Sequence, residues 1–190
     1  MAFGPLAVGC FDTHAELDDF LERTEPLRKA PEPGECFGPV DLSGRYLMSV
    51  AVTLGPDKPI RLDATFTVDT DADPWTMSVT ARALAVADGT PVGPELAATS
   101  AIAADGTFSL DFGSVELVAE ANTIVAGLGV TVSLVMDGCT STETFACGIA
   151  NGALTAPVQQ AIDGSTWALV AVPEGSEPGS LTIVAACPAE

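Results

Sequence analysis

Residues 60–69, IRLDATFTVD, alternate apolar and polar side chains at every position. A period of two residues is typical of a β-strand with one buried face and one solvated face. Every second residue is also apolar just before it, in residues 46–54 (YLMSVAVTL), and just after it, in residues 75–86 (WTMSVTARALAV). The sequence therefore predicts three successive half-buried strands, the usual content of an antiparallel sheet.

Weaker matches to the same pattern continue along the chain, whereas residues 115–127 fit a strand or a helix equally well. These further candidate strands are 96–103, 107–112, 128–136, 145–151, 165–172 and 181–185. Asp-Gly pairs punctuate the apolar stretches and supply the positive φ angles that tight hairpin turns need. The pairs stand at 88–89, 105–106, 137–138 and 163–164. Such punctuation favours a meander of hairpins over crossover connections.

Eight or nine strands joined by hairpins leave two sheet edges that must be protected. Closing the sheet into a barrel removes both edges. We therefore expect an all-β fold in residues 41–190, an antiparallel up-and-down barrel of about eight strands, with a two-sheet β-sandwich as the alternative.

The N-terminal segment, residues 1–40, has a different pattern. Residues 12–25, DTHAELDDFLERTE, predict a short helix in which Thr13 and Glu16 form a capping box. Pro26 ends that pattern, since a residue before proline avoids helical geometry. The residues that follow, as far as position 40, are rich in proline and glycine and are typical of a linker.

The five cysteines stand at positions 10, 36, 139, 147 and 187, and no C-x-x-C pair occurs. Structural zinc and thioredoxin-like chemistry are therefore unexpected. Four cysteines allow three pairings. We favour a Cys139–Cys147 bond that closes a hairpin-like loop after the Asp137-Gly138 turn signal, worth about 2.5 kcal/mol of chain entropy, with a Cys36–Cys187 bond worth roughly 5 kcal/mol. Disulfides predict an oxidising compartment, either extracellular or in a bacterial cell envelope.

Three short motifs resemble known families. Residues 6–10, LAVGC, resemble a bacterial lipobox, which implies a lipid anchor on Cys10 and membrane contact through that anchor only. LSGRYLMSV, with Gly44-Arg45-Tyr46, resembles the G-x-W opening of lipocalin-type barrels, with tyrosine replacing tryptophan. GSTWALVAV, residues 164–172, resembles the last strand of a streptavidin- or lipocalin-like meander. The resemblance implies a calycin barrel over residues 41–172.

Charge and composition argue against several function classes. Seven basic residues face 26 acidic ones, for a net charge of -19. Such a surface repels phosphate backbones, so we expect no nucleic-acid partner. The single histidine, His14, lies in the N-terminal segment, which disfavours Ser-His-Asp and Cys-His catalysis. Phosphate-loop and dinucleotide-binding motifs are absent from the sequence. We expect neither enzymatic activity nor a cofactor.

One acidic cluster has the spacing of a metal site. Asp69, Asp71 and Asp73 alternate as the ligands of a calcium loop do. The glycine of an EF-hand loop is missing, however, and its twelfth position is Thr80 in place of glutamate. A solvated hairpin tip is the favoured interpretation, with weak calcium binding as the alternative.

Four aromatic residues fall in predicted strands and are candidates to line a ligand cavity or to fill the core: Tyr46, Phe66, Trp75 and Trp167. Small inward residues such as Ala64, Ala81 and Ala83 leave room inside a barrel. We therefore predict a non-enzymatic exported protein that binds or carries a small apolar molecule. The alternative is a structural or accessory subunit that docks on a protein partner through the apolar helix stripe of Leu17, Phe20 and Leu21.

Overall fold

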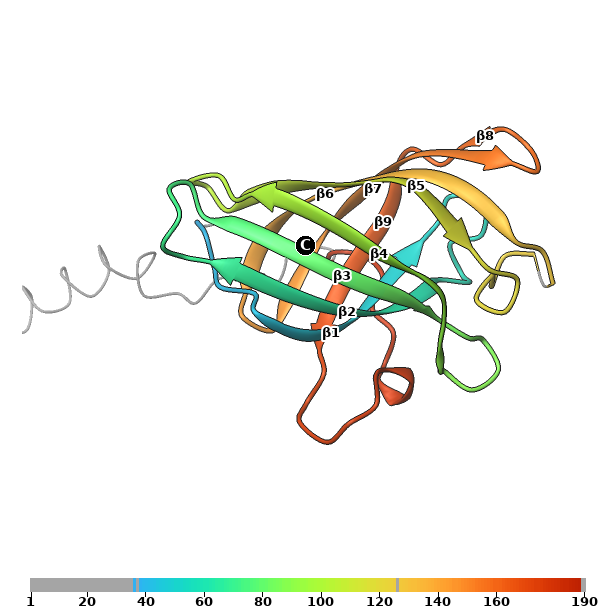
Figure 1. The fold of residues 1–190 in the computed structure, drawn as a ribbon, viewed down its shortest axis with the longest axis horizontal. Helices are drawn as coiled ribbons and strands as arrows, with labels where there is room; N and C mark the ends of the chain where they lie inside the picture. Colours follow the sequence, from blue (N-terminus) through green and yellow to red (C-terminus); the bar gives the residue numbers. More distant parts are fainter. Residues whose placement is uncertain (1–35, 37, 126, 189–190) are drawn as a thin grey trace, which may run out of the picture. The chain divides into compact units, whose positions relative to one another are not determined.

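The computed structural model describes residues 36, 38–125 and 127–188, which form one antiparallel sheet of nine strands (Figure 1). The strands are β1 (Gly44–Ala51), β2 (Ile60–Asp69), β3 (Thr76–Leu84), β4 (Pro91–Ala101), β5 (Thr107–Leu117), β6 (Val130–Thr142), β7 (Phe145–Ala156), β8 (Gln160–Ala161) and β9 (Ser165–Ala171). A short 3-10 helix, η1 (Pro178–Ser180), follows them.

The hydrogen-bonded strand order is β4-β3-β2-β1-β9-β7-β6-β5, with β8 paired to β7 outside this path. Most strands therefore pair with their neighbours in sequence, and β9 closes the circle between β7 and β1. The two ends of the path, β4 and β5, are joined by a tight turn and contact each other without a continuous ladder. The result is a nearly closed eight-stranded antiparallel barrel, which confirms the predicted fold class.

Two of the Asp-Gly turns use the same four residues, Ala-Asp-Gly-Thr, at 87–90 and 104–107. In the first, Asp88 Oδ1 accepts hydrogen bonds from the amide and the hydroxyl of Thr90, at 3.0 and 2.8 Å. Asp105 makes the equivalent bonds to Thr107, at 3.0 and 2.7 Å. These bonds lower the pKa of both carboxyl groups. Both turns, and a third at 163–164, confirm the Asp-Gly prediction.

The fourth Asp-Gly pair is no turn, and the prediction at 137–138 is wrong. Asp137 and Gly138 lie inside β6, and the chain reverses between Thr142 and Phe145. A side chain at Gly138 would collide with the indole of Trp167, which packs over this backbone. The glycine provides space for a large neighbour and does not serve to reverse the chain.

The segment after β9 contains no strand at 181–185, contrary to expectation (Figure 1, red). It returns across the outer face of the sheet, where η1 contacts β1 and the hydroxyl of Thr166 donates to Ala185 O at 2.7 Å. The outward-facing Leu47 and Ala168 are almost fully buried. The segment therefore lies against the outer face of the barrel instead of extending its sheet.

Both disulfides lie on that outer face, but their pairing differs from the favoured one. Cys36 bonds Cys139, and Cys147 bonds Cys187. Cys139 and Cys147 are opposite each other in the β6–β7 ladder but do not bond each other. Cys139 is bonded to the segment before β1, and Cys147 is bonded to the segment after β9. The observed bonds close loops with sequence separations of 103 and 40 residues. In the chain-entropy model each is worth about 4–5 kcal/mol, against about 2.5 kcal/mol for the predicted hairpin loop.

The segment before β1 is also held to the barrel. Thr140 is fully buried; its hydroxyl donates to Gly38 O at 2.9 Å and accepts from Val40 N at 3.1 Å. Leu42 is buried in the core. Residues 38–42 are thus attached to the barrel by hydrogen bonds and by a buried leucine.

The predicted helix at 12–25 and the candidate lipid-bearing Cys10 lie outside the described residues. Within the part that the structure describes, no helix has the length and apolar character required to cross a bilayer.

Candidate ligand cavity

The aromatic side chains gather near the barrel end where β2 meets β3. Tyr46 and Phe66 pack edge to face, with ring centroids 5.5 Å apart, and Phe108 lies 5.9 Å from Trp167. Tyr46, Phe66 and Trp167 are fully buried. Methionine and leucine side chains fill the space around them: Leu42, Met48, Met77, Leu110, Met136 and Leu169. This end of the barrel is a packed core.

Each predicted aromatic has a structural role. Trp167 Nε1 donates to the carbonyls of Asp137 and Ile149, at 3.1 and 3.2 Å, and the Tyr46 hydroxyl donates to Glu143 O at 2.7 Å. Trp75 is partly buried against the same core, and its carbonyl accepts a hydrogen bond from Ile102 N. None of the four candidate aromatics lies among the residues that line the cavity described below.

Burial raises the pKa of Tyr46 to about 12, with smaller contributions from Asp41 and Glu143. Tyr46 is the only tyrosine, so ultraviolet absorbance reports its ionisation alone. We expect ionisation near pH 12 in the folded protein and near pH 10 in denaturant. The neutral phenol is favoured in the folded state. The contribution of the neutral Tyr46 phenol to the free energy of unfolding is therefore complete below pH 10, and it disappears as the pH rises toward about 12. A single transition near pH 10 in folded protein would contradict this burial.

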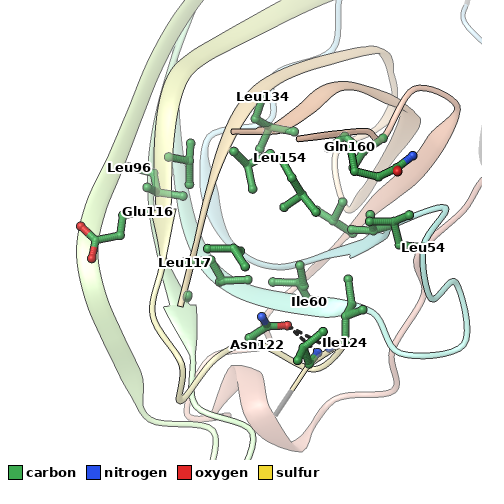
Figure 2. Close-up of a pocket in the computed structure, with 18 of the residues that line it drawn as sticks. Leu54, Ile60, Leu96, Glu116, Leu117, Asn122, Ile124, Leu134, Leu154 and Gln160 are labelled. Carbon is green, nitrogen blue, oxygen red and sulfur yellow. Dashed lines mark hydrogen bonds between the residues drawn. The ribbon is translucent and has the colours of Figure 1, made fainter. Parts of the chain in front are cut away.

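The opposite end of the barrel holds a cavity of about 350 Å³ (Figure 2). Because the strands are antiparallel, the β1–β2, β3–β4, β5–β6 and β7–β9 connections all meet at this end. All but four of the lining residues are aliphatic or proline: Val50, Val52, Leu54, Ile60, Leu62, Ala83, Pro94, Leu96, Val115, Leu117, Ile124, Val125, Val130, Val132, Leu134, Leu154, Val158 and Ile162. The four polar residues are Glu116, Asn122, Gln159 and Gln160.

Asn122 organises the loop that forms one side of the cavity. Its Oδ1 accepts hydrogen bonds from Ile124 N and Val125 N, at 3.0 and 3.1 Å (Figure 2). Its Nδ2 donates to Leu128 O at 2.8 Å. Asn122 is buried, with 4% of the residue exposed. Its amide is therefore committed to the loop, and this loop presents aliphatic side chains to the cavity.

Glu116 lies where β5 approaches β4. Its neighbours Val115 and Leu117 point inward and are buried, whereas Glu116 is exposed and points away from the other labelled side chains (Figure 2). Pro94 and Leu96 of β4 line the same cavity. The cavity thus extends to the seam between β4 and β5, where no ladder closes the wall.

The candidate calcium ligands lie at the other end, around the β2–β3 connection. Asp69 Oδ1 accepts a hydrogen bond from Asp71 N at 3.1 Å, a local turn contact. The described residues contain no group of three or more histidine, cysteine or carboxylate side chains arranged to hold a metal ion.

Comparison of the chain with protein-family models, curated proteins and solved structures finds no significant match. The interpretation of the cavity therefore depends on its own geometry and chemistry.

Proposed function

We propose that this protein is a non-enzymatic carrier or binder of a small aliphatic molecule, which occupies the cavity at the open end of the barrel. The supporting observation is the lining: a space of about 350 Å³ with almost exclusively aliphatic walls. Ligand sites in proteins measure about 300–1,000 Å³ and are mostly apolar with a few polar groups. Eight-stranded barrels have an interior wide enough for one small ligand.

The volume suggests a ligand size. At about 30 Å³ for each water-sized group, the cavity accommodates roughly ten to twelve non-hydrogen atoms. A medium-length acyl or isoprenoid chain has this size. Exposed aliphatic residues near the opening, including Leu54, Val125 and Val158, would contact such a chain as it enters.

The two disulfides support an exported location, in the extracellular space or a bacterial cell envelope. In that setting an apolar molecule needs protection from water during transfer. A barrel whose two terminal segments are both fixed by covalent bonds is suited to that task.

Filling the cavity should abolish binding. We expect Leu154→Trp, on the inner face of β7, to weaken binding of 1-decanol at least tenfold, because the indole occupies the space of the ligand. Thr155→Trp is the matched control, since Thr155 is exposed on the adjacent outward position. Isothermal calorimetry and native mass spectrometry measure the two variants against the unchanged protein. Equal loss in both variants, or no binding by the unchanged protein, would contradict the proposal.

A second candidate function is docking of a protein partner on the apolar rim. Leu54, Val125 and Val158 are 42%, 49% and 61% exposed, which is high for aliphatic side chains around one opening. Native mass spectrometry of protein isolated from its own source separates the two functions. A small co-purifying molecule supports carriage, whereas a stoichiometric protein without a small molecule supports docking.

A further inference from the structure

We propose that the cavity selects aliphatic ligands with an uncharged polar end, such as an alcohol or an amide, over fatty acids in their anionic form. This inference rests on the proposed function and specifies its ligand class. It follows from the charges and hydrogen-bonding groups around the cavity.

No lysine, arginine or histidine lines the cavity among the described residues. A carboxylate that enters an apolar cavity loses its hydration, and only a cation or several hydrogen-bond donors offset that cost. The one charged lining residue is Glu116, whose carboxylate points outward from the wall and has the same sign of charge as a fatty acid, so it offers no ionic partner. The net charge of -19 adds a repulsive field over longer distances. An anionic ligand therefore encounters long-range repulsion and finds no ionic partner among the residues that line the cavity.

Neutral polar ends have suitable partners at the rim. Asn122 is committed to its own loop, so the remaining lining amides are those of Gln159 and Gln160. Both residues are exposed, and the Gln160 amide extends away from the aliphatic side chains (Figure 2). An amide side chain both donates and accepts hydrogen bonds, as a hydroxyl or carboxamide does. A ligand chain buried among the aliphatic residues would place its polar end beside these two amides.

The lining also contains no aromatic residue within the described part of the chain. Flat ring systems are usually held by stacking on aromatic side chains, whereas a flexible chain packs well among valine and leucine. The walls thus favour a saturated or isoprenoid chain, and the rim favours an uncharged end.

Three ligands of equal chain length test the inference: 1-decanol, decanamide and decanoate. Decanamide and decanoate have nearly the same shape and differ in charge. At neutral pH we expect calorimetry on the whole protein to show decanol and decanamide binding at least tenfold more tightly than decanoate. The difference should shrink as the pH falls through the carboxyl range, about 4–5, because decanoic acid becomes neutral. Circular dichroism at each pH verifies that the barrel stays folded.

A cation at the rim should reverse the preference. Gln159→Lys places an ammonium at an exposed lining position, and we expect at least a tenfold gain in decanoate affinity relative to decanol affinity. Gln159→Met is the matched control, which removes the amide without adding charge and should leave decanoate weak. Unchanged decanoate affinity in Gln159→Lys would contradict the placement of the polar end.

The outcomes separate the two proposals. If none of the three ligands binds, the proposed function fails. If decanoate binds as tightly as decanamide at neutral pH, the selectivity inference fails and carriage of aliphatic molecules still stands.

Discussion

Replacing Trp167 with alanine is expected to lower the free energy of unfolding by about 3–5 kcal/mol, the range for removing a fully buried aromatic side chain. Trp167 is 0% exposed, and its indole packs against Phe108 and over Gly138. Alanine also leaves the carbonyls of Asp137 and Ile149 without the indole donor. The barrel would lose both a large apolar contact and a link between β9, β6 and β7. Urea denaturation followed by circular dichroism measures the change.

Trp75→Ala is the matched control for the same residue type. Trp75 is partly buried at the edge of the core, and the hydrogen bond that it makes in the structure uses its backbone carbonyl, which alanine retains. We expect a loss smaller than that of Trp167→Ala by at least 1–2 kcal/mol. Equal losses in the two variants would show that Trp167 is not the centre of the core. Absence of folded Trp167→Ala protein would agree with the prediction, and Trp167→Phe then provides a milder variant with the same direction of change.

The fold could be predicted because a strand with one buried face and one solvated face alternates apolar and polar residues in its sequence. Residues 60–69 alternate at every position, and the structure makes them a strand with those bounds. Aspartate followed by glycine and threonine marks a turn that the side chains themselves stabilise, as at Asp88 and Asp105. Gly138 shows the limit of this signal. A glycine also occurs where a neighbouring side chain needs space, and Trp167 is 29 positions away in sequence.

The cavity could be predicted only in part. Alternation identifies the strand residues that face inward, such as Val50, Leu62 and Val132, and they do line it. The same alternation places Tyr46, Phe66 and Trp167 inward. The sequence alone does not specify how far along the barrel axis each inward residue lies, so it does not distinguish the packed end from the end that holds the cavity. The loop residues were missed for another reason. Asn122 and its neighbours belong to residues 115–127, whose pattern fits a strand and a helix equally well, and their position depends on hydrogen bonds within the loop.

The disulfide pairing depends on the path of the terminal segments, which alternation does not encode. Spacing favoured Cys139–Cys147 because the two lie close in sequence, and the ladder does place them opposite each other. The segments that contain Cys36 and Cys187 cross the same outer face, where Cys36 bonds Cys139 and Cys187 bonds Cys147.

A peptide map of the unreduced protein should yield Cys36–Cys139 and Cys147–Cys187 linked peptides. Recovery of a Cys139–Cys147 peptide would contradict the structure.

Removing either bond should destabilise the barrel by a large amount. We expect the paired change Cys36→Ala with Cys139→Ala to lower the free energy of unfolding by about 4–5 kcal/mol, and Cys147→Ala with Cys187→Ala by about 4 kcal/mol. The effect acts mainly through the unfolded chain, whose conformational freedom each bond restricts over loops of 103 and 40 residues.

Urea denaturation of each paired variant measures the change in the free energy of unfolding, with the unchanged protein in excess reductant as the control. Reduced protein should be less stable than either variant, because it has lost both bonds. Equal stability of reduced and oxidised protein would mean that the segments are held by packing alone, through contacts such as Thr140 with Gly38 and Thr166 with Ala185.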